Sequence, residues 1–123
     1  MNTIRTLHIT ITGFNHYYGL RPFAIGNLVQ CRKEPGNLHD DEAILCRLPY
    51  IGTVGYVANS PHTTAGGTMS AGRIYDLVPD QFFVRVLFTT QSMVICQVEG
   101  ETDNGLEAEF ARQGETEPCS DAP

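Results

Sequence analysis

Hydrophobic and polar residues alternate along several short stretches of the chain, and this period of two predicts β-strands. Within residues 4–12, apolar side chains occupy positions 7, 9 and 11, with polar side chains between them. Five further apolar-rich stretches, bounded by glycine, proline or polar turn residues, predict strands at 25–33, 43–48, 51–57, 82–88 and 93–98. Glycines at 52 and 55 predict a bulge or a close backbone approach in the fourth strand.

The pattern changes between the fourth and fifth predicted strands. Asn59-Ser60-Pro61 combines a capping side chain with proline, which predicts the start of a helix. Apolar residues at 74, 77 and 78 share one helical face and predict a second short helix over 71–78, with Gly66-Gly67 as a hinge. The predicted fold is therefore mainly β: a small closed six-stranded barrel with short helices between strands four and five.

Composition places the chain among ordinary globular proteins. Its 123 residues fit one domain, and a hydrophobic content of 41% is sufficient for a core without disulfides. No apolar run reaches about 18 residues, so we expect no membrane span. No long apolar segment follows the charge near the N-terminus, so we expect no secretory signal.

The four cysteines form no Cys-x-x-Cys pair, which argues against a zinc ribbon. Cys31, Cys46 and Cys96 lie within predicted strands, as expected for small buried hydrophobic residues in a reducing cytoplasm. Cys119 lies in a polar segment and is expected to be a free thiol. We therefore expect a cytoplasmic protein.

The net charge of −6 is concentrated near the C-terminus. Residues 99–123 contain eight acids and one base, whereas residues 1–98 contain six acids and seven bases. We therefore predict a barrel domain over 1–98 and an acidic, disordered tail over 99–123, in which 106–110 could form a short helical turn. A near-neutral body neither favours nor excludes nucleic acid.

The turn between the second and third predicted strands is the best candidate for function. Pro35-Gly36 and Asn37 predict a tight bend, and the polar side chains after them have no role in the core. Asn37 could contact a ligand or close its own turn, and Asp40 could likewise bind a ligand or local backbone. Tyr17, Tyr18 and His39 are flat rings that can stack on a base.

The acidic residues 40–42 do not predict catalysis or metal binding. Neighbouring carboxylates on an extended chain point to opposite faces, so they rarely converge on one ion. The sequence contains no calcium-loop pattern and no Gly-x-Ser-x-Gly nucleophile elbow. We expect no enzyme activity, no metal and no cofactor.

The order of these segments resembles the HIRAN domain family. The matching motifs are Thr12-Gly13, His16-Tyr17-Tyr18-Gly19, Glu34-Pro35-Gly36-Asn37-Leu38-His39-Asp40-Asp41-Glu42-Ala43-Ile44 and Gly52-Thr53-Val54-Gly55-Tyr56-Val57. The resemblance covers roughly residues 6–98. It implies an OB-like or SH3-like β-barrel that binds DNA, because members fused to fork-remodelling helicases capture the 3′ end of a single strand.

Carried over to this chain, the resemblance implies that Asp40 accepts the terminal 3′-hydroxyl. Tyr17 and Tyr18 would stack on bases or line the pocket, and Asn37 would help to hold the end. The full set of expected nucleic-acid-binding residues is His16, Tyr17, Tyr18, Asn37, His39, Asp40 and Tyr56. The expected protein is a monomeric, non-catalytic module for single-stranded DNA in repair or replication-related processes.

The chain departs from the family where basic or aromatic residues are common. It has His39 where tyrosine is frequent, His16 where a basic residue precedes the tyrosines, and Asn59 and Ser60 where basic residues contact phosphate. With a body charge of only +1, phosphate-driven affinity should be small. The alternative is a protein-interaction or small-ligand module on the same barrel, and a hydrolase using Asp40 is a third class.

Overall fold

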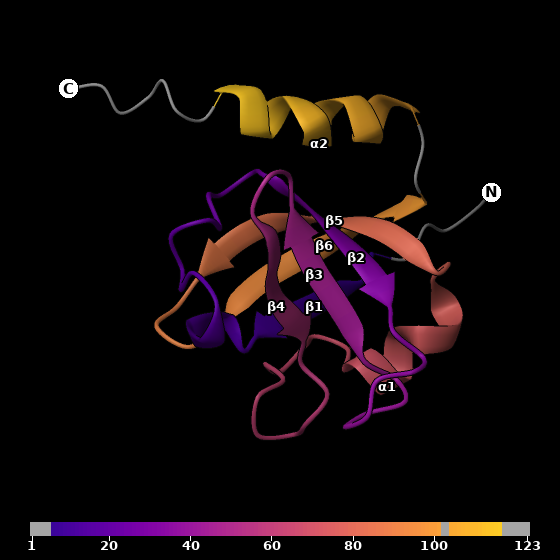
Figure 1. The fold of residues 1–123 in the computed structure, drawn as a ribbon. Helices are drawn as coiled ribbons and strands as arrows, with labels where there is room; N and C mark the ends of the chain where they lie inside the picture. The colour runs from indigo at the N-terminus through magenta and orange to yellow at the C-terminus, as the bar shows by residue number, and fades with distance from the viewer. Residues whose placement is uncertain (1–5, 102–103, 117–123) are drawn as a thin grey trace.

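Six antiparallel strands form a closed barrel in the order β1-β4-β3-β2-β5-β6 (Figure 1). The computed structural model describes residues 6–101 and 104–116. The strands are β1 (His8–Thr12), β2 (Leu28–Lys33), β3 (Ile44–Leu48), β4 (Gly52–Val57), β5 (Gln81–Thr89) and β6 (Val94–Glu101). The predicted six-stranded, mainly β barrel is confirmed. Its second strand begins later than expected, because Gly26 at φ 92° and a bond from the Asn27 amide to Ala24 O form a turn.

Short helices lie between β4 and β5, as predicted. These are α1 (Ala71–Ile74), which Ser70 caps through a bond from the Arg73 amide, and the 3₁₀ helix η2 (Tyr75–Leu77). The expected helix start at 59–61 is wrong. Residues after Ser60 form turns in which the Thr63 and Thr64 hydroxyls donate to Ser60 O, and such side chains compete with the helical pattern.

Close approach between β1 and β4 requires the glycine at position 55. A Cβ atom there would lie 2.8 Å from Ile11 Cγ2 and 2.9 Å from Thr12 O. The register of the β3–β4 pair also shifts between Cys46 and Arg47. The prediction of a bulge or close approach at this strand is thus confirmed, and the approach aligns Thr12 with Tyr56 across the pair.

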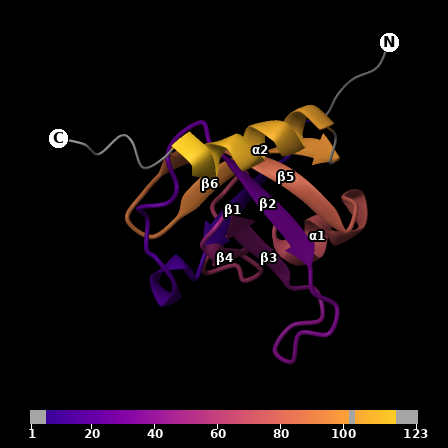
Figure 2. The same cartoon turned by 45° about the horizontal axis from the view of Figure 1, so that its top comes forward.

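The chain after residue 98 differs from the expected disordered tail. Strand β6 continues to Glu101, and α2 (Asn104–Thr116) lies across the barrel over β2 and β5 (Figure 2). Phe110 is only 8% exposed, and its ring centroid lies 5.2 Å from that of Phe83. The acidic composition of this segment did not predict the contact. A single buried ring and a few polar contacts are enough to dock the helix.

Polar contacts complete the docking of α2. Arg85 on β5 donates to Glu109 at 2.7 Å, and this bond lowers the pKa of the Glu109 carboxyl. The Gln113 side chain pairs with the Leu28 backbone, accepting from its amide at 2.6 Å and donating to its carbonyl at 3.0 Å. The described fold therefore includes this helix and does not end at residue 98.

The barrel interior is filled by aliphatic and phenylalanine side chains together with three cysteines. Cys31, Cys46 and Cys96 are buried and free, as predicted, and burial raises the pKa of the Cys46 and Cys96 thiols. Cys119 lies outside the described residues. Among the helices of the described ranges, none is both long and apolar enough to span a membrane.

Candidate functional site

Three segments that are distant in sequence converge on one pocket of about 500 Å³, which we call the Asp40 pocket. They are the end of β1 with the aromatic loop after η1 (Phe14–His16), the turn between β2 and β3, and the end of β4 with the residues that follow it. The pocket is lined by Thr12, Tyr17, Asn37, His39, Asp40, Ala43, Tyr56, Val57, Ala58, Asn59 and Ser60.

Asn37 shapes the turn that carries His39 and Asp40. Its side-chain oxygen accepts hydrogen bonds from the His39 amide at 2.8 Å and the Asp40 amide at 3.1 Å. This is the turn-closing arrangement typical of asparagine. Asn37 therefore closes its own turn, which was one of the two roles expected for it. The same side chain also borders the pocket.

Glu34 joins the turn to β4. Its Oε1 atom accepts from Asn37 Nδ2 at 3.0 Å and from the Tyr56 hydroxyl at 2.9 Å. Burial, followed by the bond to the Glu34 carboxylate, raises the pKa of Tyr56 to about 12. Tyr56 is therefore a protonated donor at neutral pH, and Glu34 fixes the direction of its ring.

Asp40 is held by two donors on different segments. Its Oδ1 atom accepts from the Glu42 amide at 2.9 Å, and its Oδ2 atom accepts from Asn59 Nδ2 at 2.9 Å. Asn59 in turn accepts from the Gly72 amide at 2.8 Å, which ties the carboxylate to α1. A carboxylate oxygen can accept two hydrogen bonds, so each Asp40 oxygen retains acceptor capacity toward the pocket.

The structure brings together five of the seven residues expected from the sequence. Tyr17, Asn37, His39, Asp40 and Tyr56 line the Asp40 pocket, whereas Tyr18 and His16 do not. His16 is exposed at the end of η1, and Tyr18 turns toward a second pocket.

Two residues that sequence reasoning did not assign to the site also shape it. Glu34 orients Tyr56 and Asn37, and Asn59 holds Asp40. Asn59 was expected to cap a helix. Its polar side chain directly after a buried strand was the signal that could have placed it at the site.

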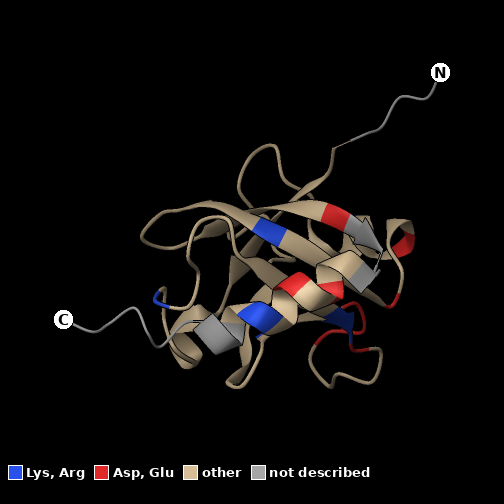
Figure 3. Ribbon diagram, turned by 90° about the horizontal axis from the view of Figure 1, so that it is seen from above, with Lys and Arg blue, Asp and Glu red and all other residues tan. Residues whose placement is uncertain are grey.

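The Asp40 pocket has a negative rather than a positive lining. It contains the Asp40 carboxylate and no lysine or arginine among its described lining residues. Lys33 and Arg85 lie elsewhere and are engaged, with Lys33 donating to Val78 O at 2.7 Å and Arg85 bound to Glu109. Figure 3 shows basic segments separated from one another across the described part of the face it presents.

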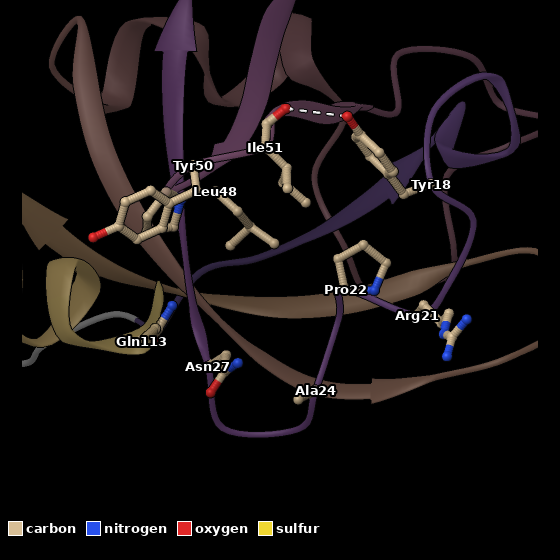
Figure 4. A pocket seen from close by; sticks show the side chains of 10 residues that line it. Tyr18, Arg21, Pro22, Ala24, Asn27, Leu48, Tyr50, Ile51 and Gln113 are labelled. Carbon is tan, nitrogen blue, oxygen red and sulfur yellow. Dashed lines mark hydrogen bonds between the residues drawn. The ribbon is translucent and has the colours of Figure 1, made fainter. Parts of the chain in front are cut away.

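A second pocket, of about 680 Å³, opens on the other side of the aromatic loop and is called the Tyr50 pocket (Figure 4). Leu48 and Ile51 form its floor between the Tyr18 and Tyr50 rings, with Arg21 at the rim. Its lining comprises Tyr18, Arg21, Pro22, Ala24, Asn27, Leu48, Pro49, Tyr50, Ile51 and Gln113. The pocket therefore includes a residue of α2, which extends beyond the short helical turn expected at 106–110.

The site is suited to bind a ligand that carries a polar group next to a flat ring. In the Asp40 pocket a carboxylate can accept from a hydroxyl or amino group, while Tyr17, His39 and Tyr56 supply ring faces or edges. Within residues 6–101 and 104–116, no group of three or more His, Cys, Asp or Glu side chains is placed to hold a metal ion.

The fold has a counterpart among solved structures. The crystal structure of the HIRAN domain of human HLTF is similar, with a TM-score of 0.51 and 17% sequence identity, covering 89% of this chain and 88% of that chain. The chain has a HIRAN-like fold. No protein-family model and no curated protein sequence matches it. At this identity the likeness concerns the fold.

Proposed function

We propose that this protein is a non-catalytic binding module that captures the 3′-hydroxyl end of single-stranded DNA in the Asp40 pocket. The observation that carries the proposal is the convergence of Tyr17, the 37–40 turn and Tyr56 on one hollow. The HIRAN-like fold supports DNA as the ligand, and the resemblance to that family favours a role in DNA repair or replication-related processes.

The hydrogen-bond geometry favours a terminal hydroxyl over a phosphate. Asp40 accepts one hydrogen bond at each oxygen, so a 3′-hydroxyl can donate to its remaining acceptor capacity. A 3′-phosphate would instead place a second negative charge beside the Asp40 carboxylate, which repels it. The Tyr17 and His39 rings can stack on the terminal base.

The test compares two oligonucleotides that differ only at the end. A dithymidine with a free 3′-hydroxyl should bind, and the same dithymidine with a 3′-phosphate should bind much more weakly, as measured by calorimetry. Asp40→Asn removes the charge and should weaken 3′-hydroxyl binding about tenfold, since a hydrogen bond to a charged group is the stronger kind. In the same variant, the difference in affinity between the 3′-hydroxyl and the 3′-phosphate dithymidine should become smaller.

The neighbouring acid provides a matched control. Asp41→Asn makes the same change of charge at an exposed side chain outside the lining of the pocket, and should leave both affinities nearly unchanged. Equal binding of the two ends by the unsubstituted protein would refute end capture.

One observation favours a second candidate, a small-ligand or protein-interaction module that does not bind DNA. The Asp40 pocket lacks lysine and arginine among its lining residues, so it offers nothing positive to a phosphate backbone. Binding of an uncharged hydroxylated ligand or a protein partner, without any oligonucleotide response at low salt, would establish this candidate instead.

A further inference from the structure

We propose that the Tyr50 pocket is a second nucleotide subsite, which receives a base and phosphate upstream of the 3′ end held in the Asp40 pocket. The inference rests on the proposed function. It adds that the DNA strand, after its 3′ end is bound in the Asp40 pocket, continues across the surface to the Tyr50 pocket. None of the residues that define the Tyr50 pocket, apart from Tyr18, was expected from the sequence to bind a ligand.

The two pockets share a wall. Tyr17 lines the Asp40 pocket and its neighbour Tyr18 lines the Tyr50 pocket, so consecutive residues about 3.8 Å apart at Cα serve both hollows. A strand that leaves the Asp40 pocket over this loop reaches the Tyr50 pocket directly.

The Tyr50 pocket offers ring faces for stacking. The Tyr18 and Tyr50 side chains lie on opposite sides of its apolar floor and are 52% and 78% exposed (Figure 4). Tyr50 has φ 72°, the only positive φ of a non-glycine residue in the described ranges. A side chain held outward at such a backbone position contributes little to the core, and strained backbone of this kind is enriched at binding sites.

The charge of this pocket complements that of the first. Arg21 stands at its rim, and among the described residues no hydrogen-bond or ion-pair partner occupies its guanidinium. The described lining includes no aspartate or glutamate. A backbone phosphate can therefore find here the positive charge that the Asp40 pocket lacks. Asn27 adds an amide group to the lining, whereas the Gln113 amide is held by the Leu28 backbone.

Oligonucleotide length is the direct test. Dithymidine and hexathymidine, both with a free 3′-hydroxyl, are titrated into the full chain at low salt. The hexamer should bind about tenfold more tightly, because it can reach the second subsite and stack there. Tyr50→Ala should abolish most of this gain and leave dithymidine affinity unchanged, whereas Tyr50→Phe keeps the ring and should retain the gain.

Salt dependence provides a second readout. Arg21→Gln should reduce the slope of log affinity against log salt for the hexamer by about 0.7, the value for one phosphate contact on a single strand. It should not change the slope for dithymidine. Leu77→Ala, an exposed apolar residue on η2 outside the lining of both pockets, is the control and should change neither measurement.

The outcomes separate this inference from the proposed function. Equal affinity for the two lengths, with preference for the 3′-hydroxyl intact, would overturn the second subsite and leave end capture standing. If the hexamer still bound more tightly than dithymidine in both the Tyr50→Ala and the Arg21→Gln variants, the strand would lie elsewhere. That result would also overturn the second subsite. A proline-rich peptide that binds through Tyr50 where the hexamer does not would assign the pocket to a protein. No binding by either oligonucleotide would overturn both proposals.

Discussion

The Asp40 pocket and the Tyr50 pocket share one aromatic loop but are built in opposite ways. In the first, the polar turn between β2 and β3 bonds to its own backbone and then to Tyr56 and Asn59, and Tyr17 borders the pocket from the aromatic loop. The second is assembled from the aromatic loop, the β3–β4 turn and α2, and the Tyr18 hydroxyl donates to Ile51 O at 3.5 Å. A turn that is closed by hydrogen bonds to its own backbone can be predicted from the sequence. A pocket formed by several distant segments depends on how the whole chain folds.

Detaching α2 should impair the Tyr50 pocket and spare the Asp40 pocket. Phe110→Ala removes a buried ring that contacts Phe83, and should lower the free energy of unfolding by about 3 kcal/mol. Because Gln113 borders only the Tyr50 pocket, the length-dependent gain in oligonucleotide affinity should fall while dithymidine binding persists. Chemical denaturation and calorimetry measure the two effects.

Glu107 on the same helix supplies the control for this prediction. Its side chain is exposed, so Glu107→Ala should leave the free energy of unfolding nearly unchanged. Loss of dithymidine binding in a folded Phe110→Ala variant would show that the two pockets are not independent.

Replacing one asparagine in each pocket tests the contribution of the 37–40 turn to stability. Asn37→Ala deletes the acceptor for two backbone amides and should cost about 1–2 kcal/mol of unfolding free energy, measured by denaturation. Asn27→Ala is the matched change in the Tyr50 pocket, where no hydrogen bond of the Asn27 side chain is present among the described residues. Equal costs at the two positions would contradict the view that only the Asp40 pocket is locally bonded.

A gain of affinity should follow from a larger ring at position 39. His39 is exposed and lines the Asp40 pocket, so His39→Tyr enlarges the stacking surface without disturbing the core. We expect dithymidine to bind about fivefold more tightly, at the lower end of what base stacking contributes. Unchanged or weaker binding in calorimetry would mean that this ring does not contact the base.

The smallest effect concerns the proton of Tyr56. Its pKa is raised from about 10 to about 12, so the folded chain holds this proton more tightly than the unfolded chain. The resulting stability is fully present below pH 10 and is lost as the pH rises toward about 12. Tyr56→Phe should flatten this decline in denaturation experiments. An identical decline in the variant would assign it to other groups.

The sequence was sufficient for the barrel and for most of the first pocket. Alternation in one stretch and apolar-rich runs in five others predicted the six strands, and the polar turn together with the tyrosine loop pointed to Tyr17, Asn37, His39 and Asp40, which do converge. Such features are local, since each depends on residues within one strand or one turn.

Features that depend on long-range packing could not be found in this way. The docking of α2 depends on Phe110 meeting Phe83 and on Gln113 meeting Leu28, contacts invisible in a segment rich in acids. Tyr50 lies between the predicted strands 43–48 and 51–57 and was assigned no role from the sequence. A large ring in a turn, with no apparent role in the core, was the available signal.

End capture in the Asp40 pocket can be followed by NMR chemical shifts of side chains and amides during titration with dithymidine bearing a free 3′-hydroxyl. We expect shifts at Asn37, Asp40 and Tyr56 with little change at Tyr50, and much smaller shifts for the 3′-phosphate form. Shifts of equal size for the two ends, or shifts confined to residues outside the Asp40 pocket, would contradict end capture.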